Sequence, residues 1–212
     1  MTAVSSRVST LSTGTRLPDD SPHRGTSERI LVAALDRFAE LGFGATSIRD
    51  IAGDVGLNSA TLYSHFANKE AILAELVLLG HQTHHARLLD AVLTSGGDPA
   101  SQLNAFAREH VLVHCEFPRL AVVANIELHA LSYAAAAPAL ALRAQSIGLV
   151  TGILQRGQAS GAFHLVHLEA TVAAIAALGQ QAAHWFPNPV VDLERDQLAD
   201  HYCTLVSRMV CA

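Results

Sequence analysis

Two short helices joined by a glycine turn are predicted between Ser47 and Phe66, and this pattern constrains the fold more than any other part of the sequence. Apolar residues stand at helical spacing on both sides of Gly56. The small residue Ala52 falls where the two helices would cross, and Gly56 tolerates the positive φ that such a turn needs. The residues expected to face a shared core are Ile51, Val55, Leu57, Leu62 and Phe66. The sequence therefore predicts a helix-turn-helix.

The outer face of the second of these helices is polar and small. It carries Asn58, Ser59, Ala60, Thr61, Tyr63 and His65. A short helix with such a face is suited to the major groove of double-stranded DNA. One alternative is a small helical bundle whose polar face is only solvated, and another is a helical protein-interaction module.

The rest of the chain indicates an all-α fold of about nine helices, because no segment alternates like a strand. Before the helix-turn-helix, the apolar stripe from Ile30 to Ala39 predicts one helix, which Gly42 and Gly44 end. Pro138 is expected to open a helix, since proline suits a first turn. The later helices are expected at about 69–93, 99–116, 119–131, 138–160, 168–185 and 193–210.

Composition narrows the class of protein. Half of the 212 residues are apolar and 16% are charged, which indicates a globular chain. The three cysteines suit neither a disulfide framework nor a four-cysteine zinc site, and we expect a cytoplasmic protein. Polar residues interrupt every long apolar stretch, so no membrane segment is expected. Residues 1–23 lack the apolar block of a secretory signal and are expected to form a disordered tail.

The net charge of −5 argues against a protein that coats nucleic acid without specificity. It does not exclude a specific contact made by a few well-placed donors. No Gly-x-Ser-x-Gly motif, phosphate loop or dinucleotide fingerprint is present, so we do not expect an enzyme. His114 and Cys115 are neighbours in a helix and point about 100 degrees apart, so they do not form a catalytic dyad.

The segment from Thr46 to Lys69 resembles the signature of the TetR family. The matching pairs are Ile51-Ala52, Val55-Gly56, Leu62-Tyr63, His65-Phe66 and Lys69-Glu70, and the resemblance covers about residues 24–84. It implies a helix-turn-helix DNA-binding domain over 24–84 and a helical ligand-binding and dimerisation domain over 85–212. It further implies a transcriptional regulator, by family default a repressor that binds a palindromic operator as a homodimer and is released by a ligand.

By the same resemblance, residues 58–61 and Tyr63 would meet base edges or phosphates of double-stranded DNA. The residues that would hold the DNA backbone are Thr46, Ser47, Arg49, Tyr63, His65 and Lys69. The second helix contains no arginine or lysine, so the two-point contact to guanine is not available from it. Recognition of the DNA sequence would then depend on contacts made by small side chains, on DNA shape and on arginines of the tail.

The last two expected helices carry small residues that permit close approach. The resemblance places a four-helix dimer interface there, with the candidate residues Ala176, Ala183, Tyr202, Leu205 and Met209. The alternative is that this stripe belongs to the core of a single chain.

The helices after residue 84 are rich in Ala, Leu and Val, which favours a small apolar effector and no cofactor. Residues 183–187, followed by 192–209, resemble regulators of sterol or fatty-acid breakdown that respond to acyl-CoA thioesters. Arginines would then pair with the nucleotide phosphates. The candidate pocket residues are His114, Phe117, Glu127, Trp185, Arg119 and Arg143.

Twelve histidines leave a second possibility open, a zinc-type, metal-responsive regulator of the same fold. Residues at i, i+3 or i, i+4 share a helix face, and imidazole is a good ligand for zinc. The candidate ligands are His81, His85, His110 and His114, with His84, Cys115, Glu127 and His129 as neighbours that could complete a site. The alternative is that these histidines only bridge or cap helices.

Overall fold

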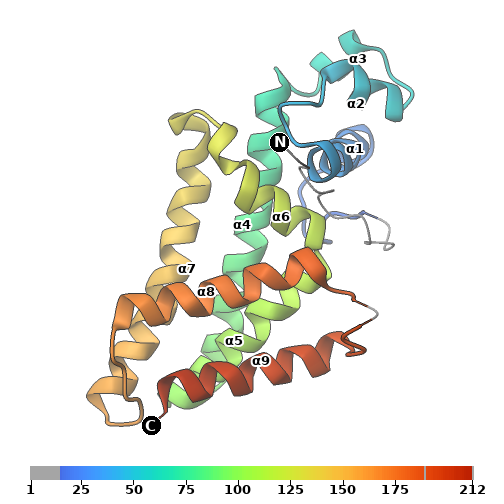
Figure 1. The fold of residues 1–212 in the computed structure, drawn as a ribbon. Helices are drawn as coiled ribbons and strands as arrows, with labels where there is room; N and C mark the ends of the chain where they lie inside the picture. The colour runs from blue at the N-terminus through green and yellow to red at the C-terminus, as the bar shows by residue number, and fades with distance from the viewer. Residues whose placement is uncertain (1–14, 189, 212) are drawn as a thin grey trace, which may run out of the picture. The chain divides into compact units, whose positions relative to one another are not determined.

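The computed structural model describes residues 15–188 and 190–211, and in these ranges every regular element is helical (Figure 1). The all-α prediction is confirmed. Nine α helices and one 3-10 helix are present among the described residues: α1 (Thr26–Leu41), α2 (Ile48–Asp54), α3 (Ser59–Tyr63), α4 (Lys69–Thr94), α5 (Pro99–Glu116), α6 (Pro118–Ile126), η1 (Glu127–Ala130), α7 (Tyr133–Ala159), α8 (Leu168–Trp185) and α9 (Arg195–Val210).

The chain forms two compact units. Among the described residues, the first contains 15–81 and 119–139, and the second contains 82–118, 140–188 and 190–211. The first unit is therefore larger than the domain expected over 24–84, because residues 119–139 cluster with it. Helix α4 begins in the first unit and ends in the second.

Helix α1 provides much of the core of the first unit. Its buried side chains repeat at helical spacing, as the sequence indicated: Ile30, Leu31, Ala34, Leu35, Phe38 and Ala39. The helix ends at Gly42, whose φ of 85° lies in the region that glycine adopts readily and whose N–H donates to the Phe38 carbonyl.

Residues 15–23 differ from the expected disordered tail; residues 1–14 of that tail lie outside the described residues. Leu17 and Ser21 are only 5% and 2% exposed. The Thr15 hydroxyl donates to Asp36 of α1, and His23 Nε2 lies 3.2 Å from the Glu75 carboxylate. Burial of Leu17 and these polar contacts hold the segment against the unit, which a count of apolar residues in the tail does not reveal.

Helix α7 begins five residues earlier than predicted, at Tyr133, so Pro138 lies inside it rather than at its start. The four alanines after Tyr133 are the strongest helix formers, and the Ser132 hydroxyl accepts a hydrogen bond from the Ala135 N–H at 3.4 Å. The end of α3 also differs from the prediction, because this helix ends at Tyr63 rather than Phe66.

By length and composition alone, helix α7 could cross a membrane. Of its apolar 18-residue segment, 28% is buried. This differs from the expectation that no segment would pass such a test. A single helix of this kind is weak evidence for a membrane protein, because core helices of soluble proteins have the same length and composition.

In the second unit, α5 packs against α8 and α9 (Figure 1). One cluster of buried residues joins α4, α5, α7, α8 and α9 around Phe106, Ile153 and Val206, and a second lies around Val111, Ala182 and Tyr202. The Arg108 guanidinium adds an ion pair between α5 and α9, with Nη2 2.6 Å from Asp196.

Cysteine reactivity provides a first test of this packing. Burial raises the pKa of the Cys115 thiol to about 12 and that of Cys203 to about 11, whereas Cys211 is exposed. Because the thiolate is the reactive form, we expect one fast-reacting thiol per native chain at mildly alkaline pH, measured with a chromogenic disulfide, and three in concentrated guanidinium chloride. Two fast thiols in the native protein would contradict the burial of α5 against α9.

Candidate DNA-binding surface and ligand-binding unit

Helix α2 begins with a capping box. The Ser47 hydroxyl accepts a hydrogen bond from the Asp50 N–H at 3.2 Å, and the Ser47 N–H donates to the Asp50 carboxylate at 2.9 Å. The Ser47 hydroxyl, which donates to the Asp50 carboxylate at 2.7 Å, and the Ser47 N–H together lower the pKa of Asp50 below its usual value, so the carboxylate stays ionised at neutral pH. The start of α2 is thus fixed by two residues that lie at the surface.

The turn between α2 and α3 is held on both sides. Gly56 has a φ of 69°, and the Leu57 N–H donates to the Ala52 carbonyl at 2.9 Å. The Arg29 guanidinium of α1 donates to the Val55 carbonyl at 2.6 Å. Asn58 then caps α3 by accepting the Thr61 N–H at 2.8 Å. The helix-turn-helix geometry inferred from Gly56 is therefore present, with a capped second helix.

Replacing Gly56 with alanine should lower the free energy of unfolding by about 1–2 kcal/mol, because a Cβ disfavours positive φ. Gly53 in α2 is the matched control, since an added Cβ there meets no atom within 4 Å and its backbone is helical. Gly53→Ala should leave the unfolding free energy unchanged or raise it by up to about 1 kcal/mol. Urea denaturation measures both, and equal effects of the two substitutions would rule out strain at Gly56.

Helix α3 presents the outer face that the sequence predicted. Leu62 is fully buried, whereas Tyr63 is 52% exposed. Nine of the ten residues proposed to contact DNA are exposed or half-buried, and only Thr46 is buried. The nine are Ser47, Arg49, Asn58, Ser59, Ala60, Thr61, Tyr63, His65 and Lys69.

Two of the proposed DNA contacts are directed into the protein instead. Thr46 is buried, and its hydroxyl donates to the Gly42 carbonyl at 3.0 Å. The Lys69 ammonium donates to the carbonyls of Phe43 and Thr46 at 2.7 and 2.6 Å, and it lies 4.2 Å from the centre of the Phe43 ring. Lys69 thus fastens the start of α4 to the loop after α1, and the polar groups of both Thr46 and Lys69 are engaged within the chain.

Arg24, the residue before Gly25 at the start of α1, is also engaged within the chain. The Arg24 guanidinium donates to the backbone carbonyls of Asp19 and His23 at 3.0 and 2.7 Å, so it stabilises the chain before α1. Arg37 pairs with Asp54 at 2.6 Å and joins α1 to α2. Hydrogen bonding from Arg37 lowers the pKa of Asp54.

The six candidate pocket residues are not brought together within one unit. Glu127 and Arg119 belong to the first unit, and His114, Phe117, Trp185 and Arg143 belong to the second. Arg119 Nη1 lies 2.8 Å from Asp36 and 2.9 Å from Glu40, so its charge is already balanced by two carboxylates of α1. Arg119 as a phosphate ligand therefore stays a prediction, and a phosphate would have to compete with these two carboxylates.

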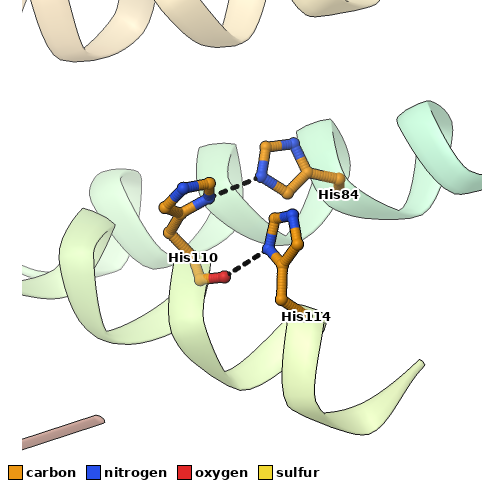
Figure 2. A group of neighbouring side chains, drawn as sticks. All are labelled: His84, His110 and His114. Atoms are coloured by element: carbon orange, nitrogen blue, oxygen red, sulfur yellow. Dashed lines mark hydrogen bonds between the residues drawn. The ribbon is translucent and has the colours of Figure 1, made fainter. Parts of the chain in front are cut away.

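The candidate metal ligands are distributed differently from the set we expected. His81 belongs to the first unit, and His85 Nδ1 lies 3.0 Å from the Ser146 hydroxyl. Cys115 is buried with Ala182, Leu198 and Tyr202, and His129 bonds the Ile126 carbonyl. His110 and His114 do lie together, and the histidine beside them is His84 (Figure 2).

Among the candidate dimer residues, Ala183 and Tyr202 are buried inside the chain, and Tyr202 belongs to the buried cluster that α5, α8 and α9 share. Ala176 and Leu205 are half-buried and Met209 is exposed. The outward face of α8 is instead made of small and polar residues: Ala170, Ala173, Ala174, Ala177, Gln181 and His184.

A capped helix-turn-helix with an exposed polar second helix, followed by a separate helical unit, defines a DNA-binding protein of the transcriptional regulator class. The family model described as "Bacterial regulatory proteins, tetR family" matches residues 30–76, and that described as "Tetracyclin repressor-like, C-terminal domain" matches residues 96–210. The chain belongs to the TetR family of bacterial transcriptional regulators.

Three relatives illustrate the similarity. The transcriptional repressor KstR2 of Rhodococcus jostii is 25% identical over 190 residues, which are 89% of this chain and 92% of the relative. A regulatory protein of the tetR family from Rhodococcus RHA1 has a TM-score of 0.83 at 30% identity and covers 90% of this chain and 100% of its own. AibR, solved with isovaleryl coenzyme A and operator DNA, shares the fold, with a TM-score of 0.76 at 20% identity over 84% of this chain and 96% of its own.

Proposed function

We propose that this protein is a dimeric repressor, acting in the cytoplasm, that binds a palindromic operator and leaves it when a small molecule binds the second unit. The observation that carries the proposal is the exposed polar face of α3, held on a capped and hydrogen-bonded turn. The naming of its relative KstR2 as a repressor supports the direction of regulation.

In this proposal α3 enters the major groove, where Tyr63, Ala60 and Thr61 approach the bases and the backbone. The Thr61 hydroxyl donates to the Asn58 side chain at 3.1 Å, so these two residues act as one preorganised group. Ser47 and Arg49 at the start of α2 are exposed and suit phosphate contacts. Because few cations are available, we expect a shallow dependence of operator affinity on salt concentration.

The effector that we propose is an acyl-CoA thioester with an apolar acyl part. The pairing of AibR with isovaleryl coenzyme A in its solved structure supports this choice. Among the candidate arginines, Arg143 belongs to the second unit and is half-buried, so it remains the candidate for the nucleotide phosphates. The ligand would release the protein from DNA by binding more tightly to the conformation that fits DNA poorly.

We further propose that the small outward face of α8 pairs with its copy in a second subunit. Replacing the exposed Ala177 with arginine should shift the protein from dimer to monomer, because a long charged side chain cannot be accommodated between closely packed helices. Ala86→Arg, at an exposed position of α4, is the control and should leave the dimer intact. Sedimentation velocity measures both, and a dimeric Ala177→Arg variant would move the interface elsewhere.

The experiment that tests the proposed function is selection of random duplex DNA by the purified protein. We expect the retained fragments to contain a palindrome with half-sites about one helical turn apart. A thioester series with acyl chains of increasing length should then release this operator. If folded, dimeric protein enriches no sequence, the proposal is wrong.

A further inference from the structure

Three histidines of the second unit meet at one point. His84 comes from α4, and His110 and His114 stand one turn apart on α5 (Figure 2). One nitrogen from each lies within 4.8 Å of the other two. The centre of the His84 ring lies 5.1 Å from that of His110 and 5.2 Å from that of His114. We propose that these histidines bind a divalent transition metal ion, with zinc as the best match, a role separate from the proposed operator binding.

The hydrogen bonds assign the nitrogen that each α5 histidine can offer. His110 Nε2 lies 3.0 Å from the Ala176 carbonyl, which can only accept, so Nε2 carries the proton and Nδ1 carries the lone pair. His114 Nδ1 lies 2.6 Å from the His110 carbonyl, so its lone pair is on Nε2. A backbone carbonyl that holds the far N–H of an imidazole is the usual outer partner of a metal-binding histidine.

The contact between His84 and His110 suits replacement of a proton by a metal. His84 Nε2 lies 2.8 Å from His110 Nδ1, and the two atoms share one proton in a hydrogen bond. Two nitrogens bound to tetrahedral zinc at about 2.0–2.1 Å stand roughly 3.3 Å apart. The pair would need to open by about half an ångström, which a small rotation of the half-buried His84 ring provides.

The surroundings fix the α5 histidines before any ion binds. His110 and His114 are each 4% exposed, and the Phe106 ring stacks on His110 at 5.8 Å. Gly179 of α8 also lies against His110, where an added Cβ would be 2.1 Å from Cδ2. Two buried ligands held in place and a half-buried third form a largely preorganised site.

The donor set selects the type of metal. Three imidazoles without a carboxylate favour zinc and its borderline neighbours over magnesium or calcium, which prefer oxygen. Three protein ligands leave a fourth position for water or another small ligand. Cys115, next to His114 in sequence, is buried in the cluster around Val111 and Tyr202 and is therefore not part of the set.

The test is a zinc titration of the full chain, without a polyhistidine tag and stripped with a chelator, in competition with a chromophoric chelator. We expect one zinc ion per chain and an affinity at least 100-fold weaker in His84→Gln. His85→Gln is the matched control, because His85 is the next residue of α4 and bonds Ser146 instead; its affinity should be unchanged. Absence of stoichiometric binding, or an equal loss in both variants, overturns the proposal.

X-ray absorption of the zinc-loaded wild-type chain gives a second measurement that does not depend on how the variants fold. We expect three imidazole nitrogens around zinc at about 2.0–2.1 Å. A shell with fewer than two imidazoles would place the ion elsewhere and overturn the assignment to His84, His110 and His114.

Discussion

Replacing Tyr63 with alanine is expected to weaken operator binding by about 100-fold or more. Tyr63 is the largest exposed side chain on α3, at 52% exposure, and a well-made protein–DNA contact contributes roughly 1–3 kcal/mol. A dimer loses this contact in both half-sites, so the losses add. Fluorescence anisotropy with a labelled operator duplex measures the dissociation constants at a fixed salt concentration.

Tyr133→Ala is the matched control for this measurement. Tyr133 lies at the start of α7 and is 85% exposed, so the substitution removes the same side chain from a surface that the proposal does not place on DNA. Its operator affinity should equal that of the wild type. An unchanged affinity in Tyr63→Ala, or an equal loss in both variants, would remove α3 from the DNA interface.

Replacing Gly179 with alanine is expected to lower the free energy of unfolding by about 2–6 kcal/mol. The new Cβ would lie 2.1 Å from Cδ2 and 2.5 Å from Nε2 of His110, so the ring must move. Overpacking of a core costs roughly 1–3 kcal/mol. Displacing His110 also breaks its hydrogen bond to Ala176, and an unsatisfied buried polar group costs about 1–3 kcal/mol.

Gly148→Ala separates this contact from the general effect of alanine in a helix. Gly148 lies in α7, and an added Cβ there meets no atom within 4 Å. Since alanine is the better helix former, this control should raise the unfolding free energy by up to about 1 kcal/mol. Denaturant titration compares the two, and a stable Gly179→Ala variant would show that His110 is less tightly held than described.

The local part of the fold could be predicted from the sequence, because its causes are local. Gly56, Ala52 and the apolar spacing around them indicated the helix-turn-helix, and the structure contains it. The break at residues 95–99 likewise separated α4 from α5. Helix boundaries were less well predicted, as at Pro138, where the preceding alanines form a helix without help from a proline.

The partners of long side chains could not be predicted, because they depend on which helices pack together. Lys69 reaches carbonyls 23 and 26 residues away, and Arg119 pairs with α1, 79 and 83 residues away. The histidine group shows the same limit. Spacing along α5 indicated His110 and His114, but only the packing of α4 on α5 selects His84 over its neighbours.

The contact between His110 and the backbone of α8 also predicts how positions 110 and 179 vary together among related proteins. A side chain at position 179 and an imidazole at position 110 compete for the same few cubic ångströms, so neither position can change freely while the other stays as it is. In descendants of the same ancestor, we expect glycine at 179 to accompany histidine at 110, and a bulkier residue at 179 to appear only with a smaller one at 110. Paired substitution across lineages would therefore record whether the imidazole has been retained for a purpose that a simple apolar core would not require.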